Sequence, residues 1–393
     1  MAELFHINTV HNADKQGRKK TKYMIGIVAL VVILGIGILL ILSYYMGNRC
    51  LDNYEVQNTV ARSDSNNVNY CYFKGDLIKY SRSGISALDN NGKNLWNGGY
   101  EMKQPQIDIC GDYVSVADVL GKRFYVYNGK DEGTSLETTL PIVRAKVAGQ
   151  GIVAALLQDS DSNVLNIYNP YSSVDSLLVE IPTNVSEEGY PLDFDISPDG
   201  NSIVSAYMVV QGNTIENKVS FYNFTEVGQD KNTMVGGKSF GEETISRIEF
   251  VGEDEAAVFH EKGFTLFTRM KQPEVLFEKR FDEEIRSMAY SDKYIAVVTG
   301  SGEKKEKQTL HLYDRKGKEE LTRDISYEFA KMDIYNEEII FQTNHSCNIV
   351  RANGKDKFSY QFKDKIDGIF PTKNGSIYTL IDTESIKKIK LGG

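Results

Sequence analysis

Three aspartates lie close enough together to suggest a metal-binding loop. Asp193, Asp195 and Asp199 fall within seven residues, but an EF-hand calcium loop needs oxygen ligands at alternating positions, a central glycine and a closing glutamate. Pro198 interrupts that pattern. The spacing is instead typical of alternate residues on a β-strand followed by a type I turn, with Pro198 second and Gly200 fourth. We therefore predict a structural role for these aspartates and no metal ligands.

The histidines give no catalytic pattern either. The five are His6, His11, His260, His311 and His345, and none shows the H-x-x-x-H spacing. His311 lies between two leucines, which predicts a solvent-facing position on a strand. The G-x-S-x-G motif of α/β-hydrolases and the phosphate loop G-x-x-x-x-G-K-[ST] are absent. The sequence thus offers no candidate catalytic residue, cofactor-binding residue or metal ligand, and we expect no cofactor.

The four cysteines are Cys50, Cys71, Cys110 and Cys347, without a C-x-x-C pair, so a zinc site is not expected. If the body of the protein is exported, Cys71 and Cys110 are the pair to test for a disulfide, because both fall near the innermost strands of neighbouring repeats. Separate buried thiols are the alternative, and the favoured one.

One segment is long and apolar enough to cross a membrane. Met24 to Met46 runs 23 residues without a charge, which is roughly 35 Å of helix against a hydrocarbon layer of about 30 Å. The lysines and arginines of residues 15–22 precede it and only Arg49 follows it, so the positive-inside rule predicts a cytoplasmic N-terminus and an extracellular C-terminal domain. The alternative is a cleaved signal peptide, but the run exceeds a signal peptide's apolar region and no A-x-A-like cleavage site follows it.

Charge separates the tail from the body. Residues 1–49 hold six Lys/Arg and two acids, whereas the rest holds 39 Lys/Arg and 52 Asp/Glu. An acidic body lacks the clustered cations that bind phosphates, so no nucleic-acid partner is expected.

After residue 60 the sequence reads as an all-β repeat. A turn, an apolar strand and a second strand often ending in Tyr-Asn or Tyr-Asp recur eight times. The copies begin at Gly75, Gly111, Gln150, Gly200, Glu253, Asp292, Glu337 and Asn374. From Leu77 to Ile377 the mean period is about 43 residues, the length of a propeller blade. The prediction is an eight-bladed β-propeller, with seven blades as the alternative.

The last repeat, from about Lys365 to Leu391, has room for only three strands. Residues 54–60 read as a lone strand before the first repeat, so we predict that they supply the fourth strand and close the ring. The expected organisation is a cytoplasmic tail (1–23), a transmembrane helix (24–46), a linker with the ring-closing strand (47–60) and the propeller (61–393).

Two segments carry a family resemblance. The segment Gly84–Trp96 (GISALDNNGKNLW) resembles the repeat of quinoprotein-type propellers, and Phe194–Gly200 (FDISPDG) is similar to the turn of WD40-like and TolB-like propellers. The whole chain also resembles the single-pass, membrane-anchored propellers of Gram-positive anaerobes, a family without a defined role. The quinoprotein enzymes hold their cofactor with adjacent cysteines and a stacking tryptophan. This chain has no adjacent cysteines and one tryptophan, Trp96, which we predict to be an apolar anchor between blades.

The leading functional hypothesis is a non-catalytic binding or scaffold module for envelope proteins, peptides or glycans, joined to the membrane through Met24 to Met46. One alternative is an extracellular hydrolase or lyase that acts on envelope polymers with carboxylates from several blades. Another is a transmembrane sensor.

Overall fold

The computed structural model describes residues 27–28, 30–39, 48–62, 64, 67–130, 132–159, 162–173, 175–183, 185, 188–225, 233–300 and 308–392. The chain divides into two compact units, Met1–Cys50 with Lys355–Lys357, and Leu51–Gly354 with Phe358–Gly393.

In the first unit, residues 27–28 and 30–39 are helical, and their large aliphatic side chains are exposed. Within the described residues, no helix has the length and apolar character needed to span a membrane. Both ends of the expected Met24–Met46 segment, residues 24–26 and 40–46, lie outside the described residues.

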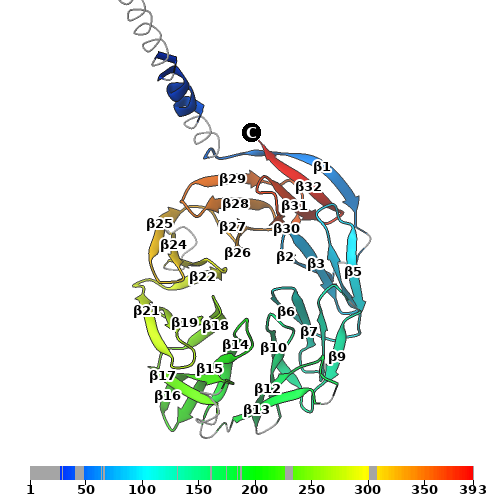
Figure 1. Cartoon of the computed structure of the whole chain (residues 1–393), viewed down its shortest axis with the longest axis vertical. Coiled ribbons are helices and arrows are strands. Elements are labelled where there is room, and N and C mark those ends of the chain that lie inside the picture. Colours follow the sequence, from blue (N-terminus) through cyan, green and yellow to red (C-terminus); the bar gives the residue numbers. More distant parts are fainter. Residues whose placement is uncertain are drawn as a thin grey trace, which may run out of the picture. The chain divides into compact units, whose positions relative to one another are not determined.

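The second unit is an eight-bladed β-propeller in which each blade is a four-stranded antiparallel sheet. Figure 1 shows the sheets side by side around a common centre, with the first strand of each blade innermost. The strands of blades 1 to 4 are β2 (Asn69–Phe73), β3 (Asp76–Ser81), β4 (Gly84–Leu88) and β5 (Asn94–Gly99); β6 (Pro105–Cys110), β7 (Tyr113–Asp118), β8 (Arg123–Tyr127) and β9 (Thr134–Glu137); β10 (Ile142–Val147), β11 (Val153–Gln158), β12 (Asn163–Tyr168) and β13 (Leu177–Thr183); β14 (Tyr190–Ile196), β15 (Ser202–Gln211), β16 (Thr214–Asn223) and β17 (Met234–Gly241). Those of blades 5 to 8 are β18 (Ile245–Phe250), β19 (Glu255–His260), β20 (Gly263–Thr268) and β21 (Glu274–Arg280); β22 (Ile285–Tyr290), β23 (Tyr294–Thr299), β24 (Gln308–Asp314) and β25 (Glu319–Ile325); β26 (Lys331–Tyr335), β27 (Glu338–Gln342), β28 (Ser346–Arg351) and β29 (Asp356–Gln361); β30 (Ile366–Pro371), β31 (Ile377–Asp382), β32 (Ser385–Gly392) and β1 (Asn53–Ala61). The eight-blade prediction is confirmed and the seven-blade alternative is wrong.

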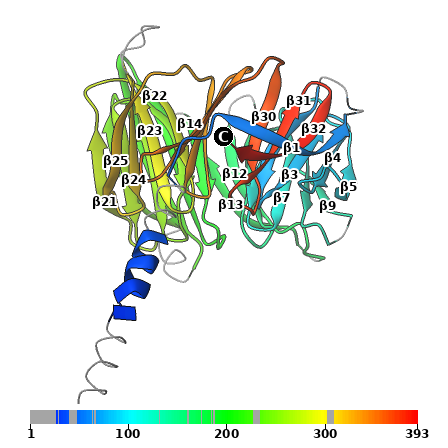
Figure 2. The ribbon, with the colours of Figure 1, turned by 90° about the horizontal axis from the view of Figure 1, so that it is seen from above.

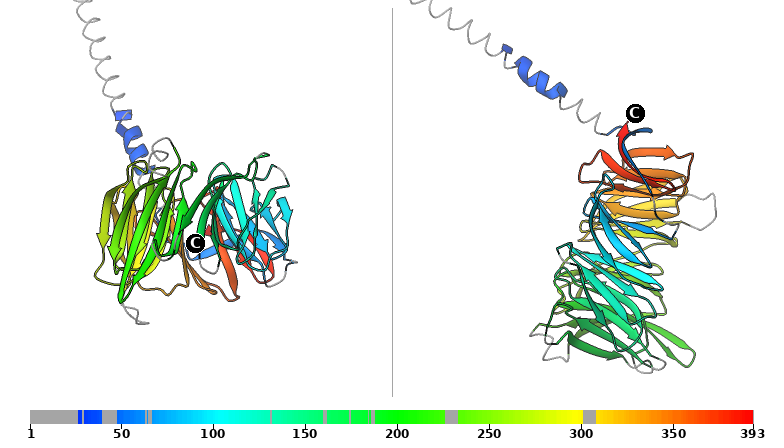
Figure 3. Two further views of the ribbon diagram at one scale, coloured as in Figure 1. Left: turned by 90° about the horizontal axis from the view of Figure 1, so that it is seen from below. Right: turned by 90° about the vertical axis from the view of Figure 1, so that its right-hand side faces the viewer.

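Side-chain burial follows position in the blade. The second strand β11 (VAALLQ) is buried except at its last residue, because both faces of its sheet pack on neighbouring blades. The outer strand β21 is exposed at its first three residues and then alternates between partly buried and exposed residues, as expected for a strand with one solvent-facing side. Figures 2 and 3 show that the strands cross the thickness of the ring, so the turns lie on its two faces.

The hydrophobic core lies between blades. One cluster joins Phe124 and Val126 of blade 2 to Val153 and Leu157 of blade 3. Another joins Leu310 of blade 6 to blade 7 through β26 and β27. Burying one such side chain contributes about 1.5–3 kcal/mol, so each blade is stabilised chiefly by its neighbours.

The ring closes through β1, which pairs antiparallel with β32 from Asn53↔Gly392 to Ala61↔Ser385. The expectation that residues 54–60 complete the last blade is confirmed. Arg62 follows β1 at the junction of the last and first blades, which we call the seam. Its Nε lies 2.9 Å from Asp64 Oδ1, and its Nη1 lies 2.5 Å from Asp367 Oδ2 of β30. Burial would raise the pKa of Asp64, but hydrogen bonds from Tyr70 and Arg62 lower it to about 2.

A second contact between blades repeats around the ring. A side chain on the outer strand of one blade packs against the glycine in the turn between the third and fourth strands of the next blade. The pairs are Val60 with Gly92, Trp96 with Gly129, Phe277 with Gly317 and Leu321 with Gly354. The Trp96 ring also stacks on Tyr127 at 5.7 Å, which confirms its predicted role as an anchor between blades.

Candidate functional site

The innermost strands carry two rings of register-equivalent residues. Nearer the turn that joins the first and second strands lies the turn-side ring: Cys71, Asp108, Lys146, Asp195, Glu249, Ala289, Asp333 and Phe370. Two residues earlier on each strand lies the far-side ring: Asn69, Gln106, Arg144, Asp193, Arg247, Ser287, Lys331 and Gly368. Residues two apart on a strand share a face. The turn-side ring therefore holds four acids and one lysine, and the far-side ring three cations and one acid.

Lys146 is the centre of the turn-side ring. Its Nζ lies 3.2 Å from Glu249 Oε2 and 3.5 Å from both Asp108 Oδ1 and Asp195 Oδ1. One lysine of blade 3 therefore joins blades 2, 4 and 5. The side chains of Lys146, Asp195 and Glu249 are all at least nine-tenths buried.

The titration of this cluster follows from three acids sharing one lysine. Burial would lower the pKa of Lys146, but the carboxylates of Asp195, Asp108 and Glu249 raise it well above its ordinary value, so the lysine stays charged. Burial raises the pKa of Asp195 well above its usual range, because Lys146 only partly offsets the loss of solvent. Burial acts on Glu249 too, but Lys146 and Arg247 lower its pKa. Asp195 is thus the acid that takes up a proton most readily.

The same aspartates cap the inner edge of the sheets. Each first strand is an edge strand, so some of its N–H groups have no carbonyl acceptor within their own sheet. A buried N–H group without an acceptor costs free energy. The Val147 N–H donates to Asp108 Oδ2 at 2.8 Å, and the Phe250 N–H donates to Asp195 Oδ2 at 2.7 Å. A carboxylate of one blade therefore satisfies the backbone of the next.

In the far-side ring, Asp193 of blade 4 lies between two arginines. Its Oδ1 accepts a hydrogen bond from Arg144 of blade 3, and its Oδ2 accepts one from the Ile248 N–H of blade 5 at 2.8 Å. Burial raises the pKa of Asp193 and Arg144 opposes that shift. Arg247 donates to Glu249 Oε1 at 2.7 Å and to Tyr290 Oη at 3.1 Å.

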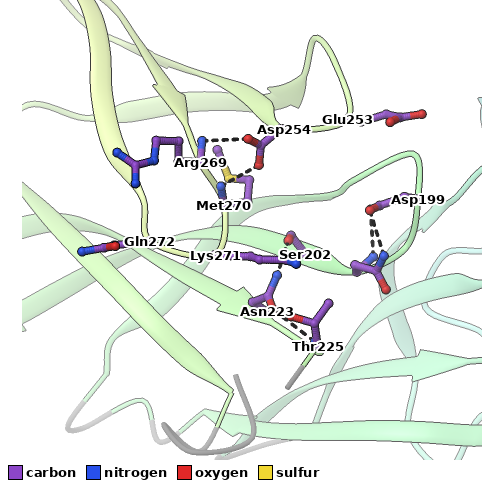
Figure 4. A pocket seen from close by; sticks show the side chains of 11 residues that line it. Asp199, Ser202, Asn223, Thr225, Glu253, Asp254, Arg269, Met270, Lys271 and Gln272 are labelled. Atoms are coloured by element: carbon purple, nitrogen blue, oxygen red, sulfur yellow. Dashed lines mark hydrogen bonds between the residues drawn. The ribbon is translucent and has the colours of Figure 1, made fainter. Parts of the chain in front are cut away.

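A pocket of about 530 Å³ lies between blades 4 and 5, on the face of the ring that carries the turns between the first and second strands (Figure 4). Its wall includes the β18–β19 turn and the β20–β21 turn, which Asp254 ties together by accepting hydrogen bonds from the Arg269 and Met270 N–H groups at 3.2 and 2.7 Å. Asp199 accepts the Asn201 N–H at 3.0 Å on the opposite wall. Short backbone-anchored turns therefore fix the shape of this pocket.

A second pocket of about 670 Å³ lies on the other side of the same β18–β19 turn. It shares Glu253 and Asp254 with the first pocket and is also lined by Tyr290, Asp292 and Arg315 of blade 6. Because Tyr290 also bonds to Arg247, this pocket adjoins the rings. The two pockets are adjacent and are separated by one acidic turn, which carries Glu253 and Asp254.

The structure places the sequence-derived residues as follows. Asp193 and Asp195 lie on β14 and Asp199 in the turn after it, where the Gly200 N–H donates to the Ser197 carbonyl at 2.8 Å. The strand-and-turn prediction is confirmed. In the described part of the chain, no group of three or more His, Cys, Asp or Glu side chains is placed to hold a metal ion.

The described histidines are not brought together. His260 is buried, with Nδ1 2.8 Å from Glu243 Oε2. Burial lowers its pKa and Glu243 opposes the shift. His311 is only partly exposed, because its ring packs on Phe281 at 4.9 Å, so the solvent-facing prediction is wrong in part. His6 and His11 lie outside the described residues.

The cysteines are separate thiols. Cys71 on β2 and Cys110 on β6 do lie on innermost strands of neighbouring blades, as expected, but both are free. Cys347 is buried and free, and Cys50 is exposed. Burial raises the pKa of Cys71 to about 12 and of Cys110 to about 11, so both remain protonated near neutral pH.

Comparison with known structures supports the architecture. BamB from Moraxella catarrhalis is similar with a TM-score of 0.51 at 10% identity, over 86% of this chain and 98% of that chain. Sqt1 from Chaetomium thermophilum, solved bound to the N-terminus of ribosomal protein L10, gives a TM-score of 0.50 at 11% identity, over 85% and 99% of the two chains. At these identities the likeness shows the fold alone.

Comparison with curated proteins gives no match. A family model does match, over residues 47–391, which is nearly all of the second unit. The chain therefore belongs to the family of unknown function DUF5711.

Proposed function

We propose that the protein is a membrane-anchored, extracellular binding or scaffold module that recruits an envelope protein, peptide or glycan without catalysis. The observation that carries this proposal is the internal bonding of the inner-strand carboxylates. Asp195 and Glu249 contact Lys146, Asp193 contacts Arg144, and Asp108 and Asp195 also accept backbone N–H groups.

Catalysis by paired carboxylates requires acids that can reach the substrate. The side chains of Asp193 and Glu249 are 3% and 5% exposed, which leaves little surface for a substrate to touch. Their bonds instead hold neighbouring blades in register. This arrangement supports a rigid frame and disfavours the alternative of an extracellular hydrolase or lyase.

Binding is supported by the two pockets beside Glu253 and Asp254. Binding sites are commonly concave, with a few polar groups fixed by a rigid scaffold. Here the polar groups sit on short turns that hydrogen bonds hold to each other, as between Asp254 and Met270. A partner would therefore meet a surface that loses little conformational freedom on binding.

The membrane anchor rests on the uncharged Met24–Met46 run and the basic residues before it. The exposed aliphatic side chains of residues 30–39 suit an apolar surrounding. The test is protease treatment of intact cells that express the full-length chain with a C-terminal tag. Loss of the tag signal, with a cytoplasmic control protein intact, supports the topology. Protection of the tag until the membrane is permeabilised would overturn it.

The binding role is tested by crosslinking the full-length chain in intact cells and comparing the recovered partners with those of two charge reversals. Glu253→Lys alters the wall shared by both pockets, and Glu180→Lys makes the same change on the exposed outer strand β13. We expect one specific partner that Glu253→Lys loses and Glu180→Lys keeps. Release of products from envelope polysaccharide by the purified wild-type protein would contradict a non-catalytic role.

A further inference from the structure

Two arginines occupy the same register position on alternate blades. Arg144 on β10 and Arg247 on β18 both belong to the far-side ring, and the ring residue of the blade between them is Asp193. All three side chains share the strand face that Lys146 and Glu249 use in the turn-side ring. In that ring, Lys146 spans from blade 3 to blade 5 at 3.2 Å. Side chains of these two blades therefore reach each other across blade 4.

Both guanidinium groups are held in fixed orientations. Arg144 bonds to Asp193, whose other oxygen accepts the Ile248 N–H at 2.8 Å. Arg247 bonds to Glu249 and Tyr290 and lies over the Tyr290 ring at 5.9 Å. A guanidinium held in place loses little entropy when it binds an oxyanion, and it has five N–H donors, of which these contacts use only some.

Burial separates the two signs of charge. The side chains of Arg144 and Arg247 are 31% and 42% exposed, whereas their carboxylate partners Asp193 and Glu249 are 3% and 5% exposed. The carboxylates hold the arginines in place, and the arginines are the more exposed members of the two ion pairs.

The rest of the far-side ring adds to this polarity. Its third cation, Lys331 of blade 7, is 52% exposed and pairs with Asp333 at 2.8 Å. The remaining members are Asn69, Gln106, Ser287 and Gly368, which carry no charge. Asp193 is the ring's single acid among its eight described members. A local cationic site on an otherwise acidic body attracts anions selectively.

We propose that Arg144 and Arg247 form a binding site for an oxyanion, a carboxylate or phosphate group presented by the partner, with Lys331 as a further cation. The site is formed by the far-side ring, and Tyr290, which bonds to Arg247, also lines the second pocket. This inference rests on the proposed function, since it assumes that the propeller binds a partner, and it names the chemistry of one contact.

The test uses the full-length chain in neutral detergent and two probes, a short poly-L-glutamate peptide and inorganic tripolyphosphate, in calorimetric titrations at low salt. We expect at least one probe to bind. We expect the double variant Arg144→Gln/Arg247→Gln to weaken binding by about tenfold or more, because each charge-assisted bond contributes substantially. Arg123→Gln, at the exposed first residue of β8, is the control and should leave affinity unchanged. Binding of glutamate alone identifies a carboxylate ligand, and binding of tripolyphosphate alone identifies a phosphate ligand.

A second variant covers the case in which loss of the arginines prevents folding. Ser287→Glu places a negative charge in the half-buried far-side ring without removing an ion pair, and Ser135→Glu places the same charge on the exposed outer strand β9. Only Ser287→Glu should weaken the probe. Absence of binding by both probes, or equal affinity of the wild type and the ring variants, overturns the site. If crosslinking still recovers a pocket-dependent partner, the proposed function survives that result.

Discussion

The ammonium group of Lys146 in blade 3 lies 3.2 Å from the carboxylate of Glu249 in blade 5, across the inner strand of blade 4. The contact bridges strands that are about one hundred residues apart in the sequence, since the residues are separated by 103 positions. It is therefore a tertiary contact that exists only when the ring is assembled. The stability of the ring should depend on it.

The first prediction concerns loss of the Lys146 charge. Lys146→Met should lower the free energy of unfolding by about 3–5 kcal/mol at neutral pH, because it leaves buried carboxylates without their cation. Urea denaturation of the full-length chain measures this loss. Lys318→Met is the control, since that side chain is 70% exposed and should change stability little. The loss should shrink as the pH falls, because protonated carboxyls no longer need the lysine. An equal loss at all pH values would contradict this account.

The second prediction concerns the proton on Asp195. Its pKa is raised in the folded state, so its contribution to stability is fully present below its unfolded pKa of about 3.9 and is lost as the pH rises through the folded value. Asp195→Asn cannot ionise and keeps an oxygen for the Phe250 N–H. The variant should therefore gain stability relative to the wild type as the pH rises from acidic to mildly basic.

This difference is measured by urea denaturation of both proteins over that pH range. Asp199 lies on the exposed turn of the same repeat and its pKa is lowered. Asp199→Asn should therefore lose stability relative to the wild type as the pH rises. A wild-type minus Asp195→Asn difference that does not change with pH would show that the pKa of Asp195 is not raised in the folded state.

The repeat could be predicted from the sequence because each blade has a local sequence pattern. A turn followed by apolar residues, as at Gly111 before β7, marks the second strand of each blade. Both the number of blades and the closing strand were predicted from that pattern. The polar rings were not recoverable. Asp108, Lys146 and Asp195 pair with Ser115, Ala154 and Val204, at sequence separations of seven, eight and nine. Turn length and β-bulges thus vary between blades, so spacing alone does not reveal which charges share a level.

Charge identity misleads in the same region. Arg144 and Lys146 alternate with apolar residues on β10, which is typical of an exposed strand face, yet Lys146 is buried. Burial is possible only because blades 2, 4 and 5 supply acids, and those partners lie far away in the sequence. The sequence of β10 alone therefore does not reveal the negative charges that three other strands supply to Lys146.

The third prediction concerns ring closure. Arg62→Met should remove the bond to Asp367 of the last blade and the bond to Asp64, which in turn accepts a hydrogen bond from Tyr70 of the first blade. We expect a loss of about 3 kcal/mol or more in the free energy of unfolding, because a buried ion pair is broken from one side. Limited proteolysis should cut the variant faster near residue 62. Arg269→Met removes an exposed pair with Glu274 and should do neither.

The seam also has its own pH signature. The pKa of Asp64 is lowered to about 2, so its contribution is present above the unfolded pKa of about 3.9 and is lost as the pH falls toward 2. Arg62→Met should reduce that part of the acid-induced loss, and the hydrogen bond from Tyr70 should preserve the rest. A variant that retains the wild-type acid sensitivity would place the titrating group elsewhere.

The fourth prediction tests the contact between outer strands and turn glycines. Gly317 has φ +83° and an added Cβ would lie 2.1 Å from Phe277 Cγ, whereas Gly212 has φ +60° and nothing within 4 Å. Both alanine variants incur the left-handed backbone cost of about 1–2 kcal/mol. Gly317→Ala should lose a further amount of about 1–3 kcal/mol, because Phe277 must move. Thermal or urea unfolding compares the two directly.

A double variant separates crowding from backbone strain. Adding Phe277→Ala to Gly317→Ala removes the side chain that the new methyl group meets. The double variant should therefore lose less stability than the sum of the losses of the two single variants. The same Phe277→Ala change added to Gly212→Ala should be additive, because that glycine lies in open space. Additivity at both positions would mean that Gly317 is required for its backbone conformation alone, and that its contact with Phe277 does not position blades 5 and 6.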